Sequence, residues 1–324
     1  MKIDIVIGNP PYQEETGAGT VITGKKPIYQ GFVLKSIEIT KTGKVCLIIP
    51  SRWTMRGTGL EQLHDNLEIL ENHIRNITDY MNWQVPVFNK NIQIAGGVMY
   101  FLIDKRYNGK CEYRNIDKTS ETKLKRKLIF KPAFIRNNEL VSICHKVQEL
   151  KEDTLRDLCR TNTFGLESYQ RGDITGELNL LTSSDWFRIQ RENVVTGIDL
   201  LDKYKLAVSG TTPGGGVPGK DGSYKVLGKV IELTKEDICT NTYIVIGKFN
   251  TKEEMKNLRL YLQTKFVRAL IQSTISSMHI IPYSFTYVPI QNFNIMWTDE
   301  TLYKKYNLTT NEVDYIERII KTWD

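Results

Sequence analysis

The sequence has little that would tie it to a membrane or to an oxidising compartment. No apolar run approaches the roughly 18–20 residues that a membrane-spanning helix needs, and the N-terminus MKIDIVIGNPPY lacks the zones of a signal peptide. We therefore expect a cytoplasmic protein with no membrane partner. The five cysteines never form a CxxC pair, which argues against disulfides and zinc and predicts reduced, mostly buried thiols. They are Cys46, Cys111, Cys144, Cys159 and Cys239.

Histidine is also scarce, and no internal repeat of 20 to 50 residues is present. The four histidines stand apart from any metal-ligand spacing, so each is interpreted as an ordinary surface or packed side chain and no metal is expected. They are His64, His73, His145 and His279.

The charge is unevenly distributed along the 324 residues, whose formal net charge is +7. Residues 1–150 hold 22 Lys and Arg against 15 Asp and Glu, whereas residues 151–324 hold 22 against 22. Much of the excess lies in the stretch Lys118 to Lys131, which could follow a phosphate backbone or could be a solvated linker.

The first half alternates apolar strands with helices, which predicts an α/β fold. IDIVIG is a β-branched run that ends at proline, GKVCLIIPS is a second such run, and an amphipathic segment separates them. A strand, a helix and a strand in this order predict a parallel βαβ unit. The expected strands are 3–8, 43–51, 74–80 and 96–105, and the expected helices are 27–39, about 59–69 and 137–151.

The second half has short strands between polar and glycine-rich turns, which favours an irregular, mixed second domain beginning near residue 152. Within it a single helix is expected over 252–271, and 210–222 is interpreted as a mobile surface loop. The tail predicts two short helices capped by Thr298 and Thr309. The expected domains are 1–151, 152–297 and a helical tail at 298–324. The expected strands are 186–190, 204–209, 224–227, 242–247 and 285–289.

One tetrapeptide, Asn9-Pro10-Pro11-Tyr12, carries recognisable chemistry. An amine conjugated to an aromatic ring, such as adenine N6, is a poor nucleophile because its lone pair is delocalised. The Asn9 side-chain oxygen and the Pro10 carbonyl could accept hydrogen bonds from both amine protons and so localise that lone pair. Paired prolines stiffen the loop, and Tyr12 offers a face on which a base can stack, worth about 1–3 kcal/mol. The simpler interpretation is a strand terminator, but the position at a sheet edge favours the chemical one.

At this motif the sequence resembles the S-adenosylmethionine-dependent adenine-N6 DNA methyltransferases of type II restriction-modification enzymes, including those fused to a nuclease. The resemblance implies the second half of a Rossmann-like methyltransferase sheet followed by a mixed α/β target-recognition domain. It also implies catalysis by Asn9 to Tyr12, an Asn9 that faces the cofactor, and double-stranded DNA as partner. The segments that carry it are IDIVIGNPPYQ, KPIYQGFVLKSIEI, GKVCLIIPSRW, GTGLEQL, NITDYMNWQVPVF, IAGGVMYFLIDKRYNGKCE, TNTFGL, TNTYIVIGKFNTKEEMKNLRLYLQTKFVRAL, FTYVPIQNF and WTDETLYKKYNLTTNEVDYIERII.

The sequence departs from that family in one respect. The family binds S-adenosylmethionine through a glycine-rich turn upstream of NPPY, and only eight residues precede Asn9 here. We expect the cofactor site to lie largely outside this chain, on an upstream segment or a partner subunit. No nuclease cluster can be placed, so any nuclease is expected on that same missing part.

Basic and aromatic residues near the motif and in the second half are expected to contact DNA. Arg52 follows the second apolar strand and so should share the sheet edge with Asn9, and three cations share one face of the 252–271 helix. A packing helix with a solvated face is the simpler interpretation for those three. The expected contacts are Lys25, Arg52, Phe164, Lys252, Lys256 and Arg259.

Two other functions remain open on the sequence alone. Without a cofactor site, the chain could be a catalytically incomplete specificity module that reads DNA through its second domain. Alternatively, the same chemistry could serve RNA amines or the side-chain amides of protein glutamines.

Overall fold

The structure, a computed structural model, describes residues 3–16, 24–56, 59–85, 87–89, 92–118, 120–170, 172, 174–275 and 278–323. The chain divides into two compact units, Met1–Asn138 and Glu139–Asp324. The division precedes the expected boundary near residue 152, because helix α3 (Leu140–Glu149) packs with the second unit. The expected tail domain also belongs to that unit. No helix among the described residues is long and apolar enough to cross a bilayer.

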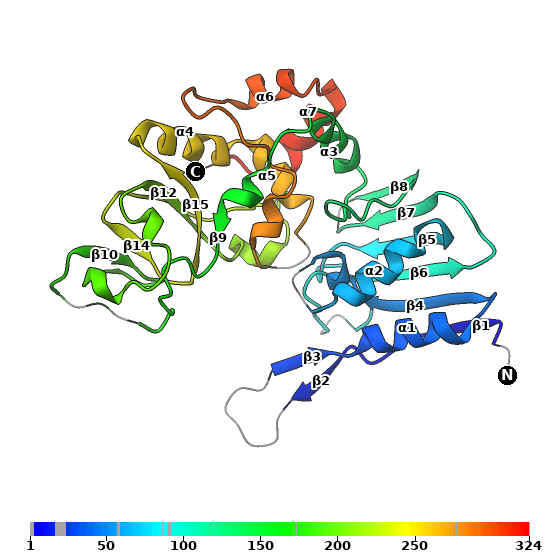
Figure 1. Ribbon diagram of the computed structural model, residues 1–324. Coiled ribbons are helices and arrows are strands. Elements are labelled where there is room, and N and C mark those ends of the chain that lie inside the picture. Colours follow the sequence, from blue (N-terminus) through cyan, green and yellow to red (C-terminus); the bar gives the residue numbers. More distant parts are fainter. Residues whose placement is uncertain are drawn as a thin grey trace. The chain divides into compact units, whose positions relative to one another are not determined.

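A six-stranded mixed sheet forms the centre of the first unit (Figure 1). Its order is β1-β4-β6-β5-β7-β8. The strands β1, β4, β5 and β7 run in one direction, whereas β6 and β8 run in the other. The predicted α/β class and the parallel pairing of the first two apolar runs are confirmed. The strands are β1 (Ile5–Gly8), β4 (Lys44–Pro50), β5 (Ile74–Tyr80), β6 (Val98–Asp104), β7 (Cys111–Ile116) and β8 (Glu121–Arg126).

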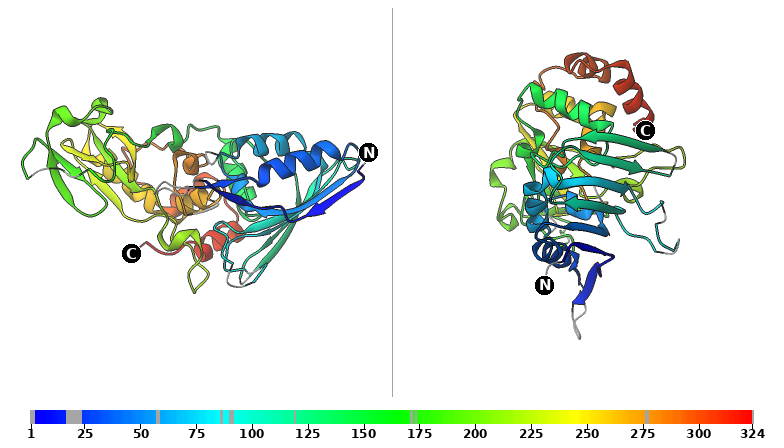
Figure 2. Two further views of the ribbon diagram at one scale, coloured as in Figure 1. Left: turned by 90° about the horizontal axis from the view of Figure 1, so that it is seen from below. Right: turned by 90° about the vertical axis from the view of Figure 1, so that its right-hand side faces the viewer.

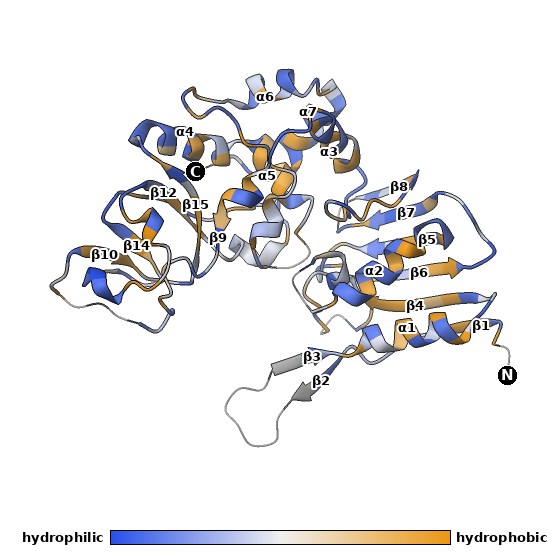
Figure 3. Ribbon diagram, viewed as in Figure 1, coloured by the Kyte–Doolittle hydropathy of each residue, from blue (hydrophilic) through white to orange (hydrophobic). Residues whose placement is uncertain are grey.

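Helices α1 (Tyr29–Ile39) and α2 (Glu61–Ile69) lie on one face of this sheet, as the left view of Figure 2 shows. Both were predicted within two residues of their observed starts. The core between helices and sheet contains Val33, Leu63 and Leu67 from the helices and alternate residues of β4 and β6. Figure 3 shows β4 and β6 as largely hydrophobic and β7 and β8 as largely hydrophilic. A hairpin of β2 (Gln13–Thr16) and β3 (Gly24–Pro27) directly follows the NPPY tetrapeptide.

The centre of the basic stretch Lys118 to Lys131 is a strand of the sheet and not a linker, while a contact with a phosphate backbone stays a prediction. Its central residues Glu121–Arg126 form β8, which pairs with β7, and the Lys123 ammonium lies 3.0 Å from the Glu112 carboxylate. Arg126 is buried, and its guanidinium donates to Asn138 and to the carbonyl of Ile135. Sequence spacing missed this because β8 carries many charges and few apolar residues.

The second unit contains two small sheets, with orders β13-β12-β15-β9 and β11-β10-β14. Three of the five expected strands are present, whereas 224–227 and 285–289 contribute only isolated bridges, from Tyr224 to Ile320 and from Pro289 to Thr154. The second of these segments begins at the end of a 3₁₀ helix, Pro282–Phe285. The strands are β9 (Cys159–Arg160), β10 (Leu178–Leu181), β11 (Trp186–Ile189), β12 (Tyr204–Ser209), β13 (Val230–Leu233), β14 (Asp237–Cys239) and β15 (Tyr243–Phe249).

The expected single helix over 252–271 is two helices, α4 (Lys252–Gln263) and α5 (Lys265–Gln272). Thr264 between them adopts an extended conformation, and its side chain caps α5 by accepting from the Val267 N–H. Asp299 adds a second cap, because its two carboxylate oxygens accept from the N–H groups of Lys265 and Phe266 at 3.0 and 2.8 Å. This cap comes from a residue distant in sequence, so helical periodicity could not reveal it.

The two C-terminal helices were predicted correctly, including their caps. Helix α6 (Asp299–Lys305) begins after Thr298, and α7 (Thr310–Ile319) begins after Thr309. The capping box of Thr309 with Glu312 is present, with the Thr309 N–H donating to the Glu312 carboxylate at 2.7 Å. The expectation of reduced, mostly buried cysteines is likewise confirmed, since all five are free and four are buried.

Candidate functional site

The candidate active site lies at the carboxyl edge of the first unit's sheet, where β1 ends and Asn9 begins. Because β1 and β4 are parallel, Asn9 and the residues after Pro50 emerge at the same edge. The ends of β5 and β7 share it, with Tyr80 paired to both Val98 and Ile116. Open α/β sheets bind their ligands at this kind of edge.

Asn9 is exposed, and within the described part of the chain its amide forms no hydrogen bond. Pro10 is buried, so it packs the loop against the first unit, whereas Pro11 is exposed to solvent. The Asn9 side-chain oxygen is therefore available to a ligand. An accessible amide oxygen is one of the two acceptors that the predicted chemistry of the tetrapeptide needs.

Tyr12 lies half-buried against the core of the first unit. Its backbone carbonyl accepts a hydrogen bond from the Ile28 N–H at 3.1 Å, which ties the loop to the start of α1. Its ring meets the Tyr29 ring edge to face, with centroids 6.4 Å apart. Burial raises the pKa of Tyr12 to about 12, so the phenol is neutral at physiological pH.

Tyr29 connects this loop to Arg52. Its side chain is almost fully buried, and burial raises its pKa, while the nearby Arg52 guanidinium acts in the opposite direction. Arg52 itself is exposed at the end of β4, at the same sheet edge as Asn9. Trp53, the next residue, points into the core beside Phe130 and Phe134 and is a packing residue.

A buried ion pair between Asp79 and Arg136 stabilises this edge of the sheet. The Asp79 carboxylate accepts two hydrogen bonds from the Arg136 guanidinium, at 2.6 and 2.8 Å. It also accepts from the Ser51 hydroxyl at 3.0 Å and from the Tyr113 hydroxyl at 2.8 Å. Burial and the Asp79 charge hold the pKa of Tyr113 well above its usual value. The network thus joins the end of β4 to β5, β7 and the segment that closes the unit.

Residues 1–88 match the Eco57I restriction-modification methylase family. The predicted resemblance is confirmed by this match and by a curated protein of Mycoplasma pneumoniae described as an uncharacterized adenine-specific methylase. That protein is 36% identical over 111 residues, which are 34% of this chain and 25% of its own length. The match therefore spans a quarter of the relative.

Solved structures of restriction-modification enzymes are also similar to this chain. The type IIL enzyme MmeI in complex with DNA shares 8% identity at a TM-score of 0.47, over 88% of this chain and 46% of that one. A type I methyltransferase subunit from Streptococcus thermophilus shares 16% identity at a TM-score of 0.27, over 48% and 33% of the two chains.

The matched segment, residues 1–88, contains Asn9 to Tyr12, Lys25 and Arg52, and the other expected DNA contacts lie in the second unit. Lys25 lies on β3, but its side chain falls outside the described residues. In the second unit, Lys252 and Lys256 are exposed on α4, while the Arg259 guanidinium lies 2.9 Å from the Glu232 carboxylate. The α4 positions thus retain two exposed cations and one that is already paired.

The structure corrects the expectation that Phe164 contacts DNA. Its side chain is 0% exposed and belongs to the core of the second unit, with Lys205 close to its ring. A buried ring cannot stack on a base, so the expected DNA contact at this residue is wrong. The sequence TNTFGL is rich in turn residues, and that feature concealed the burial of its single aromatic side chain.

Proposed function

We propose that this chain supplies the amine-binding loop and the DNA-recognition part of a site-specific, S-adenosylmethionine-dependent DNA adenine-N6 methyltransferase of a restriction-modification system. The observation that carries the proposal is the exposed, unbonded Asn9 amide at the carboxyl end of β1. The half-buried Tyr12 ring beside it supports the proposal. So does the match of residues 1–88 to a methylase family.

The proposed chemistry assigns one role to each residue of the loop. A flipped-out adenine would donate its two N6 protons to the Asn9 side-chain oxygen and the Pro10 carbonyl, while its ring stacks on Tyr12. Localising the N6 lone pair prepares it as a nucleophile. The prolines hold both acceptors in place, because a loop that must reorganise would lose this alignment. The cofactor, when bound, supplies the methyl group.

We propose that the described residues supply only part of the site for that cofactor. The glycine run 214–216 lies in a short turn of the second unit, with positive φ at all three glycines. Asn9 is the residue proposed to face the cofactor. The rest of its site is proposed to lie on an upstream segment or a partner subunit, which would also carry any nuclease.

The free edge of β1 is a suitable place for that missing part to attach. Among the described strands β1 pairs only with β4, and its outward side chains Ile5 and Ile7 are 63% and 78% exposed. Natural edge strands are usually protected by charges or covered, and parallel sheets are usually buried on both faces. A strand added parallel to β1 would end beside Asn9.

Calorimetric titration of S-adenosylmethionine into this chain alone is expected to show no binding. Binding should appear when the upstream segment or partner subunit is present. In that assembly Ile7→Lys should weaken cofactor binding, because a charge on the edge of β1 opposes pairing, while the matched exposed variant Ile69→Lys should not. Micromolar binding to the chain alone would contradict the proposed division of the cofactor site.

DNA binding by the second unit is proposed to rest on the exposed cations of α4. Replacing Lys252 and Lys256 by glutamine should reduce the slope of log K against log salt by about 1.8, since each phosphate contact contributes about 0.9. Lys35→Gln is the matched control, because that lysine already lies 2.9 Å from Glu38. Fluorescence anisotropy over a salt series measures the slope, and equal slopes for the double variant and the unsubstituted chain would exclude these contacts.

Substrate class is tested separately. The complete protein is expected to methylate duplex DNA in preference to RNA or to protein glutamine amides. Parallel assays with the three substrates and a radiolabelled methyl donor distinguish them, and a higher rate on RNA or protein would overturn the assignment to DNA.

A further inference from the structure

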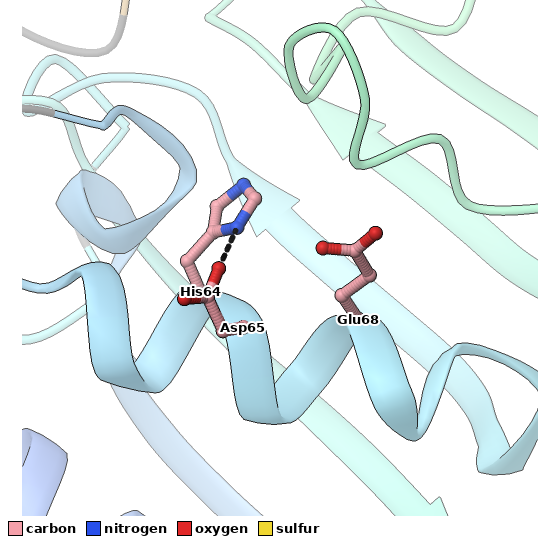
Figure 4. Close-up of side chains that lie close together, drawn as sticks. All are labelled: His64, Asp65 and Glu68. Carbon is pink, nitrogen blue, oxygen red and sulfur yellow. Dashed lines mark ion pairs between the residues drawn. The ribbon is translucent and has the colours of Figure 1, made fainter.

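Three potential metal ligands lie together on α2, although the sequence spacing of the histidines did not predict a metal site. The ligand atoms of His64, Asp65 and Glu68 all lie within 4.8 Å of one another. His64 and Glu68 are four residues apart, so they share one face of the helix. Figure 4 shows the His64 ring nitrogen Nδ1 directed at the Asp65 carboxylate, 3.7 Å away, with Glu68 one turn further along.

His64 is an unsatisfied buried group. Its side chain is 1% exposed, and neither ring nitrogen forms a hydrogen bond. Buried polar atoms without partners are rare in native proteins and call for an explanation such as an ion. The ring is also held in place, because it packs edge to face against Phe130, with centroids 5.2 Å apart, and lies beside Trp53. Its direction toward Asp65 is therefore fixed by the core.

The two carboxylates carry a negative charge that is now balanced by side chains. The Arg56 guanidinium contacts Asp65 and lies 3.9 Å from Glu68, and the Lys131 ammonium lies 2.8 Å from the other oxygen of Glu68. Both cations are long and flexible, and the Lys131 side chain is 73% exposed. The ion pair of the exposed Lys131 is weak, so a divalent ion can displace its ammonium from Glu68 at small cost.

We propose that His64, Asp65 and Glu68 form a binding site for a divalent cation of the zinc and cobalt class. One imidazole nitrogen and two carboxylate oxygens form a mixed ligand set that suits Zn²⁺ and Co²⁺, whereas Mg²⁺ and Ca²⁺ prefer oxygen alone. Water would complete the coordination on the exposed side of Asp65. The site gives the buried imidazole a partner, and it does not depend on the proposed methyltransferase function.

The test is a titration of the full chain with Co²⁺, followed by its visible absorption, and then displacement by Zn²⁺. We expect one saturable site per chain. Glu68→Gln should weaken Co²⁺ binding by at least about tenfold, the scale on which metal sites respond to loss of a supporting group. Glu71→Gln, a nearby carboxylate outside the cluster, should leave binding unchanged. His64→Gln removes a core side chain and could impair folding, so the glutamate variants decide the question.

A second variant separates this site from weak surface binding. Lys131→Met removes the ammonium that competes for Glu68, so it should strengthen Co²⁺ binding. Absence of saturable binding, equal binding by Glu68→Gln, or no gain in Lys131→Met would each overturn the proposal.

Discussion

Replacing Asn9 by alanine in the complete enzyme is expected to reduce methyl transfer to near the limit of detection while leaving DNA binding unchanged. The substitution removes one of the two acceptors proposed to hold the adenine amine. Loss of a single preorganised hydrogen-bonding group in an active site costs roughly 10²–10³ in rate. Asn9 is exposed and makes no hydrogen bond within the described chain, so the fold should not depend on it. Single-turnover transfer to an unmethylated duplex measures the rate.

The control is Asn72→Ala, which truncates an exposed asparagine away from the sheet's carboxyl edge. It should retain the full rate. Transfer by Asn9→Ala at a rate near that of the unsubstituted enzyme would refute the role of the amide. Loss of DNA binding in parallel with activity would instead indicate that Asn9 holds the DNA and not the amine.

Replacing Asp79 by asparagine is expected to cause the largest loss of stability in the first unit. The change leaves the Arg136 guanidinium buried without its counter-charge, and breaking a buried pair in this way costs about 3–5 kcal/mol. That is a large fraction of the 5–15 kcal/mol by which domains are usually stable. Urea unfolding of the full chain, followed by a signal from the first unit, measures the free energy.

Two further variants keep this prediction testable if Asp79→Asn does not fold. Tyr113→Phe removes one hydrogen bond to Asp79 and should cost about 1–2 kcal/mol. Asp199→Asn removes a carboxylate whose pKa is lowered to about 2 by hydrogen bonds from Arg160 and Lys248. That cluster is exposed to solvent, which screens it, so at most about 1 kcal/mol is expected. A cost for Tyr113→Phe no larger than that for Asp199→Asn would contradict the structural role of the buried network around Asp79.

Local signals in the sequence were sufficient for the elements that position Asn9. The run IDIVIG followed by two prolines determines both a strand and its end, and GKVCLIIPS does the same for the neighbouring strand. Their parallel pairing followed from the helix between them. The two C-terminal helices could also be predicted from the sequence, because the residues that cap them, Thr298 and Thr309, directly precede them.

The remaining features depend on residues that meet only in the folded chain. Asp79 and Arg136 are 57 positions apart, and the cap of α5 comes from Asp299. Phe164 is buried by neighbours from several distant strands, so its position among turn residues was misleading. His64 was interpreted from the sequence as an ordinary histidine, because neither the burial of its imidazole nor its approach to Asp65 and Glu68 can be deduced without the fold.

The most direct test of the proposed function is the identity of the product. Duplex DNA should be treated with the complete protein and S-adenosylmethionine, digested to nucleosides and analysed by mass spectrometry. The proposal predicts N6-methyladenine at one recurring sequence, and none from the Asn9→Ala enzyme. Methylated cytosine, or unmodified DNA from a protein that binds both the cofactor and the duplex, would contradict it.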